Sequence, residues 1–256
     1  MERLLLVKWT NVLNIVTKRV SLNHVIADSS STFNFELLMK ISQIPLSSGG
    51  TLRVSINDLN VLNKALTMIW DKQFIEITGD SLEIDITNST FDLEIHNVFN
   101  LESTIDSNVR IYNVTRRGQT SQFLQLSSKK FSTFTMSHYF DYSYDIQRIA
   151  AFLISGPKFE INLTDIYSET GKILHFEGES LITHIHNMEI HNAPNGSLPI
   201  CLSQIWFELD LNIMNINISD SNLEAFVIFG STDNVRGLRQ KSINELRQSI
   251  QDDCFP

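Results

Sequence analysis

Three histidines lie close together in the stretch GESLITHIHNMEIH, residues 178–191: His184, His186 and His191. Imidazole is a common metal ligand, and a His-x-His pair places two imidazoles on the same face of a β-strand. The first question that this sequence raises is therefore whether His184 and His186 bind a metal or simply belong to a solvent-facing strand.

The same stretch is similar to the first half of the cupin metal motif, with Gly178, the two histidines, Glu189 and Gly196 at matching places. Two residues separate His186 from Glu189, fewer than the motif has, and its second half with a third histidine is absent. Because side chains alternate along a strand, Glu189 is expected to face away from the histidines unless a turn intervenes. We therefore favour an ordinary strand with no metal, and a metal-dependent enzyme around His184 and His186 is the least favoured alternative.

Other catalytic patterns are missing. The chain has neither GxxxxGK nor GxGxxG, which phosphate-binding loops need. The GDS and GES triplets, beginning at Gly79 and Gly178, lie between expected strands, whereas a nucleophile elbow needs G-x-S-x-G at a strand-to-helix turn. Two cysteines, Cys201 and Cys254, are too few for a disulfide framework or a four-thiolate zinc site. We predict a protein that is not an enzyme and carries no cofactor.

Composition narrows the class further. The 256 residues are 42% hydrophobic and 19% charged, which is typical of a globular protein. A net charge of −9 argues against general adhesion to nucleic acid or membranes. The N-terminal run is broken by Lys8 and Asn11 and makes a poor signal peptide, and no apolar run is long enough to span a bilayer. We expect an intracellular protein with no membrane contact.

Most of the chain alternates apolar and polar residues with period two, the pattern of strands. Two segments favour helices. From Asn57 to Trp70, Leu59, Leu62, Leu66 and Ile69 recur at helical spacing, and Asn57 or Asp58 could cap the start. The second helix begins at Asp145, has Ile146, Ile149, Phe152 and Leu153 on its apolar face, and ends at Ser155-Gly156-Pro157. Short turns follow each helix and join strands, so a helix followed by antiparallel strands appears twice.

The two halves also resemble each other in sequence. ITGDSLEIDITN…LEIHN, residues 77–97, aligns with FEGESLITHIHN…MEIHN, residues 176–192, if a gap is allowed. The alignment pairs Asn88 with Asn187, and it places Asp85 and Thr87 where His184 and His186 stand. We expect a structural repeat, and an exchange of this kind is typical of a solvent-facing strand.

The region Gln204–Ser219 predicts a long strand with a bulge. Apolar residues alternate up to Ile213, and then Ile216 and Ile218 fall on the opposite parity. Because a slip of one residue moves every side chain to the other face, a bulge is expected around Met214–Asn215. An uncovered strand of this length would be a template for another chain, so we expect the protein to be part of an oligomer.

A C-terminal helix is predicted from SINELRQSIQDD, residues 242–253. Ser242 and Glu245 form a capping box, and Ile243, Leu246 and Ile250 form a narrow apolar seam that would bind the sheet or a partner. Whether the seam packs on its own chain or on another is left open.

A strand, a helix and then three antiparallel strands, repeated along the chain, resemble the sliding-clamp superfamily, which includes proliferating cell nuclear antigen and the heterotrimeric checkpoint clamp. The best match is TLRVSINDLNVLNKALTMIWDKQFIEITGDSLEIDI, and KFEINLTDIYSETGKILHFEGESLITHIHNMEI is similar to the strands that close a checkpoint-clamp domain. The expected fold is therefore α+β, rich in antiparallel sheet, with two core helices, a weaker third helix in TNVLNIVTKR (10–19) and a C-terminal helix.

The resemblance implies units at 1–100 and 101–232, a helical tail at 233–256, and a nuclear component of DNA repair or the DNA damage checkpoint. Clamp helices contact phosphates without reading bases, so Lys18, Arg19, Lys64 and Arg148 become candidate nucleic-acid ligands. Other protein subunits are the expected partners. The alternative is an adaptor of α+β fold that makes no DNA contact.

Overall fold

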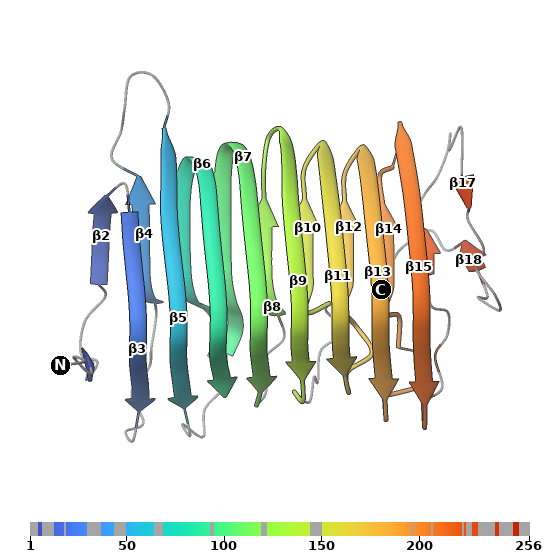
Figure 1. Ribbon diagram of the computed structural model, residues 1–256, viewed down its shortest axis with the longest axis horizontal. Coiled ribbons are helices and arrows are strands. Elements are labelled where there is room, and N and C mark those ends of the chain that lie inside the picture. Colours follow the sequence, from blue (N-terminus) through green and yellow to red (C-terminus); the bar gives the residue numbers. More distant parts are fainter. Residues whose placement is uncertain are drawn as a thin grey trace.

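The computed structural model contains strands and no helices over the residues that it describes. These residues are 5–6, 13–17, 19–29, 37–43, 50–63, 69–92, 95–118, 122–143, 150–195, 197–205, 207–221, 223, 227–229, 239–240 and 248–250. Every strand pairing in this part of the chain is parallel. The chain is a β-solenoid whose coils stack side by side along the long axis (Figure 1).

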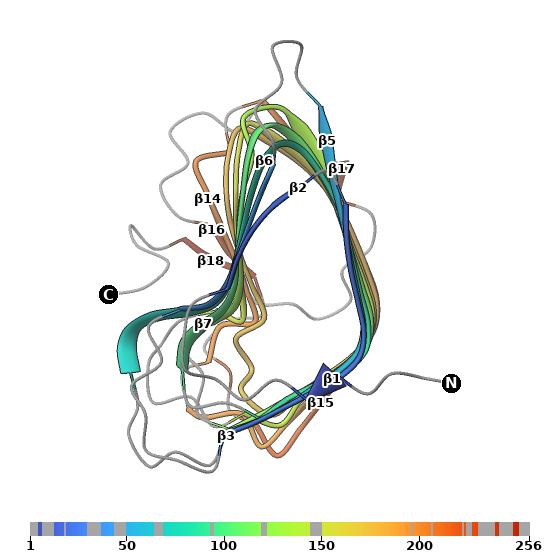
Figure 2. The same cartoon turned by 90° about the vertical axis from the view of Figure 1, so that its left-hand side faces the viewer.

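Each coil contributes one strand to each of two faces. The long face consists of β1 (Leu5–Leu6), β3 (Arg19–Ser29), β5 (Thr51–Asn63), β9 (Phe131–Asp141), β11 (Lys158–Ser168), β13 (Ser180–His191), β15 (Glu208–Ser219) and β17 (Arg239–Gln240). The short face consists of β2 (Leu13–Thr17), β4 (Leu37–Gln43), β8 (Gln122–Ser127), β10 (Phe152–Ser155), β12 (Leu174–Glu177), β14 (Ile200–Ser203), β16 (Val227–Phe229) and β18 (Gln248–Ile250). Strands β6 (Ile69–Asp92) and β7 (Ile95–Arg117) turn the corner and belong to both. Viewed end-on, successive coils superimpose, with the short strands on one side and the bent long strands on the other (Figure 2).

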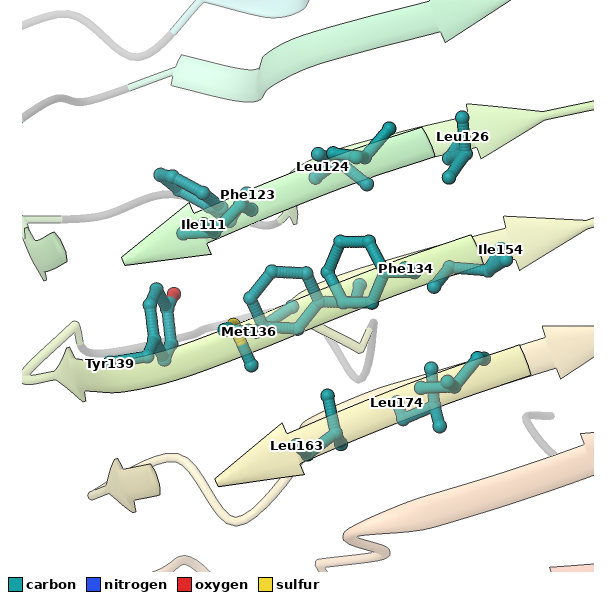
Figure 3. Packing of buried hydrophobic residues seen from close by; sticks show 14 of the residues in the cluster. Ile111, Phe123, Leu124, Leu126, Phe134, Met136, Tyr139, Ile154, Leu163 and Leu174 are labelled. Carbon is teal, nitrogen blue, oxygen red and sulfur yellow. The ribbon is translucent and has the colours of Figure 1, made fainter. Parts of the chain in front are cut away.

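Side chains at the same place in successive coils form columns. One inward column of the long face is Val54, Ile84, Val109, Phe134, Ile161, Thr183 and Leu211. Because strand side chains alternate between the two faces of the sheet, every second residue enters the space between the long and short strands, and stacking the coils buries a continuous core. Figure 3 shows part of this core, where Phe134, Met136 and Tyr139 of β9 lie beside residues of neighbouring coils.

The long strands β5, β6, β7, β9, β11, β13 and β15 each bend at one residue in the left-handed region of backbone conformation. These residues have φ between 49° and 56° and are Asp58, Asn88, Asn113, His138, Asp165, Asn187 and Asn215. Asparagine and aspartate tolerate this conformation best among residues other than glycine, because their short polar side chains bond locally. The bend shifts the alternation, so that the inward residues on either side of it are three apart instead of two.

The predicted helix over Asn57–Trp70 is wrong. Its apolar stripe was expected to begin with Leu59 and Leu62, but Leu59 and Val61 are buried two residues apart, as in a strand that continues past the bend at Asp58. The described part of this segment belongs to β5 and β6. Asp58, expected to cap a helix, is the bend residue.

The other predicted helices are also wrong where the structure describes them. Phe152–Ser155 form strand β10, Leu13–Thr17 of the weak third helix form β2, and Gln248–Ile250 of the C-terminal helix form β18. Residues 144–149 and 241–247 lie outside the described residues. The α+β class is therefore corrected to an all-strand solenoid, and the clamp-like architecture is corrected with it.

Antiparallel hairpins were expected at the short turns, and this expectation is wrong too. The turn EGES leads from β12 into β13, but these strands do not pair with each other; each pairs with its counterparts in the coils before and after it. The corner is tight, since a Cβ at Gly178 would lie 1.9 Å from the backbone oxygen of Gly156 in the preceding coil. Short turns here change the direction of the chain between faces. The predicted unit boundary at 100/101 falls within β7.

The internal repeat is confirmed through its first twelve positions. Ile86 and Ile185 lie in one inward column four coils apart, and Asn88 and Asn187 are both bend residues. The closing EIHN match is not structural, because Met188 occupies the column of Ser89. The gap in the alignment was therefore misplaced, while the coil register was right.

Candidate functional site

The histidine pair lies on the outside of the long face. His184 is exposed, and His186 is partly buried, with its Nε2 3.1 Å from Nδ2 of Asn215. Asn187 supplies the intervening turn, so Glu189 also faces outward, but on the far side of the bend. In the part of the chain that the structure describes, no three His, Cys, Asp or Glu residues are arranged to hold a metal ion.

The third histidine belongs to a row of stacked side chains across four coils. His191 stacks on Tyr167 with ring centroids 5.2 Å apart, Tyr167 lies 5.1 Å from Tyr142, and the Arg117 guanidinium lies 5.7 Å from the centre of Tyr142. Desolvation within the row, followed by the hydrogen bond to Glu169, raises the pKa of Tyr167 to about 12. The rings of His191 and Tyr167 are stacked and those of Tyr167 and Tyr142 are tilted by 40°, so the row ties neighbouring coils together.

The candidate nucleic-acid ligands remain predictions. Lys18, Lys64 and Arg148 lie outside the described residues, and Arg19 is the first residue of β3. The predicted partner-binding seam at the C-terminus also remains a prediction, because Ile243 and Leu246 lie outside the described residues. Its third residue, Ile250, pairs with Phe229 in the short face. The structure does not bring these two groups together into a described site.

The last long strand of full length differs from the strands before it. In β13, the inward side chains of Met188 and Ile190 are fully buried. Their counterparts one coil further on are Ile216, which is only partly buried, and Ile218, which is 39% exposed. The second half of β15 is therefore not covered as the same half of strands β5 to β13 is.

The pairing of β17 explains this exposure. Among the described residues, β17 pairs with β15 at Asp210 and Leu211 alone. Gln240 on the long face and Ile250 on the short face are 10 residues apart in the sequence. In seven earlier coils, the residues at the same two places in the stack are 15 to 23 residues apart, so the last coil is shorter than those before it. Within the described residues, Asn212–Ser219 has a neighbouring strand on one side only. We call this segment the open edge.

The sequence of the open edge lacks the residues that normally protect a strand edge. Its sequence, NIMNINIS, contains no charged residue, no proline and no glycine. Met214 is 51% exposed. Natural proteins usually place lysine, proline or a covering segment at such edges, because unpaired N–H and C=O groups attract another strand. The nearest acidic residues, Asp210 and Asp220, stand at its two ends.

A ladder of side-chain amides ends at the open edge. In each of three steps the amide nitrogen of a bend residue donates to the bend residue of the preceding coil: Asn113 to Asn88 at 2.9 Å, Asn187 to Asp165 at 2.9 Å and Asn215 to Asn187 at 3.1 Å. The Asn215 oxygen Oδ1 is the acceptor at the end of this ladder, and no described residue donates to it. The edge thus presents an unused acceptor beside its unpaired backbone.

The sequence predicted part of this site. The change of side-chain parity predicted at Met214–Asn215 is confirmed, but it comes from the left-handed bend at Asn215, φ 56°, and not from a bulge, because β15 pairs with β13 without a register shift. The strand begins at Glu208 and not at Gln204. The regular recurrence of Asn, Asp or His at the bend was missed. That signal is visible in the sequence once the distance between successive bend residues, which varies from 22 to 30 residues between Asp58 and Asn215, is allowed to drift.

No helix in the described residues is long and apolar enough to cross a membrane. In comparisons with known proteins, no family model, no curated protein and no solved structure matches this chain.

Proposed function

We propose that this protein is a non-enzymatic interaction module, which joins an assembly by accepting a strand from another chain at the open edge of β15. The observation that carries the proposal is the contrast between Ile190, which is fully buried, and Ile218, which is 39% exposed at the same place in the next coil. A strand added beside Asn212–Ser219 would cover the side chains of Ile216 and Ile218 and form hydrogen bonds with the backbone groups on the unpaired side of this segment.

Strand addition at a sheet edge suits this scaffold. Main-chain hydrogen bonds supply affinity, and pockets for alternate side chains supply specificity. The coils below the edge form a rigid template, because each is bonded to its neighbour along its length. The expected DNA role depended on the clamp architecture, so the proposal follows the second alternative, an interaction protein without DNA contact.

Hydrogen exchange tests the proposal directly. In the purified chain, the backbone amides of Asn212–Ser219 that point to the unpaired side of β15 should exchange much faster than the amides of β13. Assembly into the native complex should slow the exchange of these amides. Sedimentation velocity would report the assembly itself. An open edge already as protected as β13 in a monomer would overturn the proposal, because the chain would then cover its own edge.

Paired variants make the test specific. Met214→Lys with Asn217→Lys adds charge to outward positions of the open edge, a natural protection against pairing. His186→Lys with Glu189→Lys adds lysines at the same two columns on the covered strand β13. The first variant should lose the assembly and the second should keep it, with both folded by circular dichroism.

A further inference from the structure

The open edge constrains the sequence of the strand that it accepts. Its inward residues Ile213, Ile216 and Ile218 continue three core columns. An added strand must therefore place apolar side chains opposite these three positions. Because the strand pairings described for this chain are all parallel, an added strand that continues the coils runs in the same direction as β15.

The bend at Asn215 imposes a second requirement. A strand that stays paired across the bend needs its own left-handed residue there, and asparagine, aspartate or glycine adopt that conformation at least cost. The amide ladder favours asparagine, because its Nδ2 can donate to the free Oδ1 of Asn215 as Asn215 donates to Asn187.

A second copy of the chain does not fit. Head-to-tail stacking would set the open edge against β3, but β1 already pairs with Val25 and Ile26, on the half of β3 that the open edge would need. Twofold pairing of two open edges would run antiparallel and bring Asp210 of each copy toward Asp220 of the other. Like charges opposite each other destabilise strand pairs, and each chain already carries a net charge of −9.

The charges at the ends of the edge indicate the flanks of the partner strand. At the start, Asp210 is opposite Arg239 of β17, so a basic residue already occupies that place. At the other end Asp220 is exposed, with no opposite cation among the described residues. A lysine or arginine after the last apolar residue of the partner would lie opposite Asp220.

We infer that the open edge accepts a parallel strand from a different protein, with the pattern x-apolar-x-Asn-apolar-x-apolar-x followed by Lys or Arg. This inference rests on the proposed function and adds the chemistry of the partner. It assigns the bend asparagine and the terminal cation as the residues that set register and direction.

Synthetic peptides test this pattern without knowledge of the natural partner. The probe is a fluorescein-labelled peptide, TITNITITKK, and its binding to the purified full chain is followed by anisotropy. Replacing the terminal lysines by glutamates should weaken binding by about threefold or more, as expected for a solvent-exposed ion pair. Replacing the asparagine by alanine should weaken it by about tenfold, through one lost hydrogen bond and an unfavourable bend.

Three controls separate this mode from non-specific adhesion. Methylation of alternate backbone nitrogens keeps every side chain and removes donors, so it should abolish binding. Moving the lysines to the amino end tests direction and should cost as much as the glutamates do. The Met214→Lys with Asn217→Lys variant should lose the peptide, and the His186→Lys with Glu189→Lys variant should retain it.

Two results would overturn the inference and leave the proposed function intact. One is equal binding of the N-methylated and unmodified peptides, while the native complex still protects the open edge in hydrogen exchange. The other is self-association of the purified chain that protects the same amides, which would make a second copy the occupant. An edge protected in the monomer refutes the proposed function itself, so the two failures can be distinguished.

Discussion

Replacing Asn187 tests whether the bend residues hold each coil in shape. Asn187 has φ 56° and makes two side-chain contacts along the amide ladder, donating to Asp165 and accepting from Asn215. Alanine and glycine both remove these bonds, but only alanine keeps a Cβ in the left-handed region. The two variants therefore separate the backbone term from the hydrogen-bond term.

The expected costs follow from these contacts. Two partly exposed hydrogen bonds together contribute about 1 kcal/mol. Holding alanine in the left-handed region costs about 1–2 kcal/mol more, so Asn187→Ala should destabilise the chain by about 2–3 kcal/mol. Glycine avoids that penalty and pays only the extra entropy of its unfolded backbone, about 0.5–1 kcal/mol, for a total of about 1.5–2 kcal/mol.

The assay is urea denaturation of the full chain followed by circular dichroism. A matched control is Asn162 of β11, an outward residue in extended backbone whose amide donates to Glu160. There the order should reverse, with glycine worse than alanine by about 0.5–1 kcal/mol. If glycine at position 187 costs as much as alanine or more, while Asn162 behaves as expected, the left-handed bend does not carry the stability assigned to it.

Three further predictions concern buried and exposed polar groups. The carboxylate of Asp141 and the guanidinium of Arg116 are equally buried and 3.0 Å apart, so Asp141→Asn, which leaves the guanidinium without its carboxylate, should cost about 3–5 kcal/mol in chemical denaturation. The apolar double variant Arg116→Met with Asp141→Leu should recover much of this loss, and no recovery would contradict a buried ion pair. Replacing His184 and His186 together by threonine should change stability by less than about 1 kcal/mol and leave bound metal unchanged by elemental analysis, so loss of stoichiometric zinc, iron or manganese would contradict the strand interpretation. Burial lowers the pKa of His175 below its ordinary 6.5, against an opposing effect of Glu177. The unfolded chain therefore takes up a proton more readily than the folded chain, and stability should fall as the pH drops below 6.5. His175→Gln should flatten this part of the curve of urea midpoint against pH, and an unchanged slope would show that His175 is not its source.

Local features of the sequence determined the strands themselves. Alternation with period two requires only that one side of the chain be buried, and it was readable in segments such as FIEIT and KFEINLT. The same local logic located the change of parity at Met214–Asn215 and aligned Asn88 with Asn187. It also separated the outward histidines from the inward Ile185, because parity alone decides which face a side chain occupies.

The tertiary structure decided how these strands pair. A short turn such as EGES is compatible with a hairpin or with a corner, and only the coils before and after β13 make the corner favourable by pairing with it along its length. Leu59 and Leu62 have helical spacing in the sequence, yet Leu59 lies in strand β5 and shares its buried side with Val61. The open edge is likewise a property of the stack, since nothing within NIMNINIS reveals that the described part of the next coil pairs with Asp210 and Leu211 alone. Burial of a strand edge depends on residues far away in the sequence, and a local pattern carries no information about them.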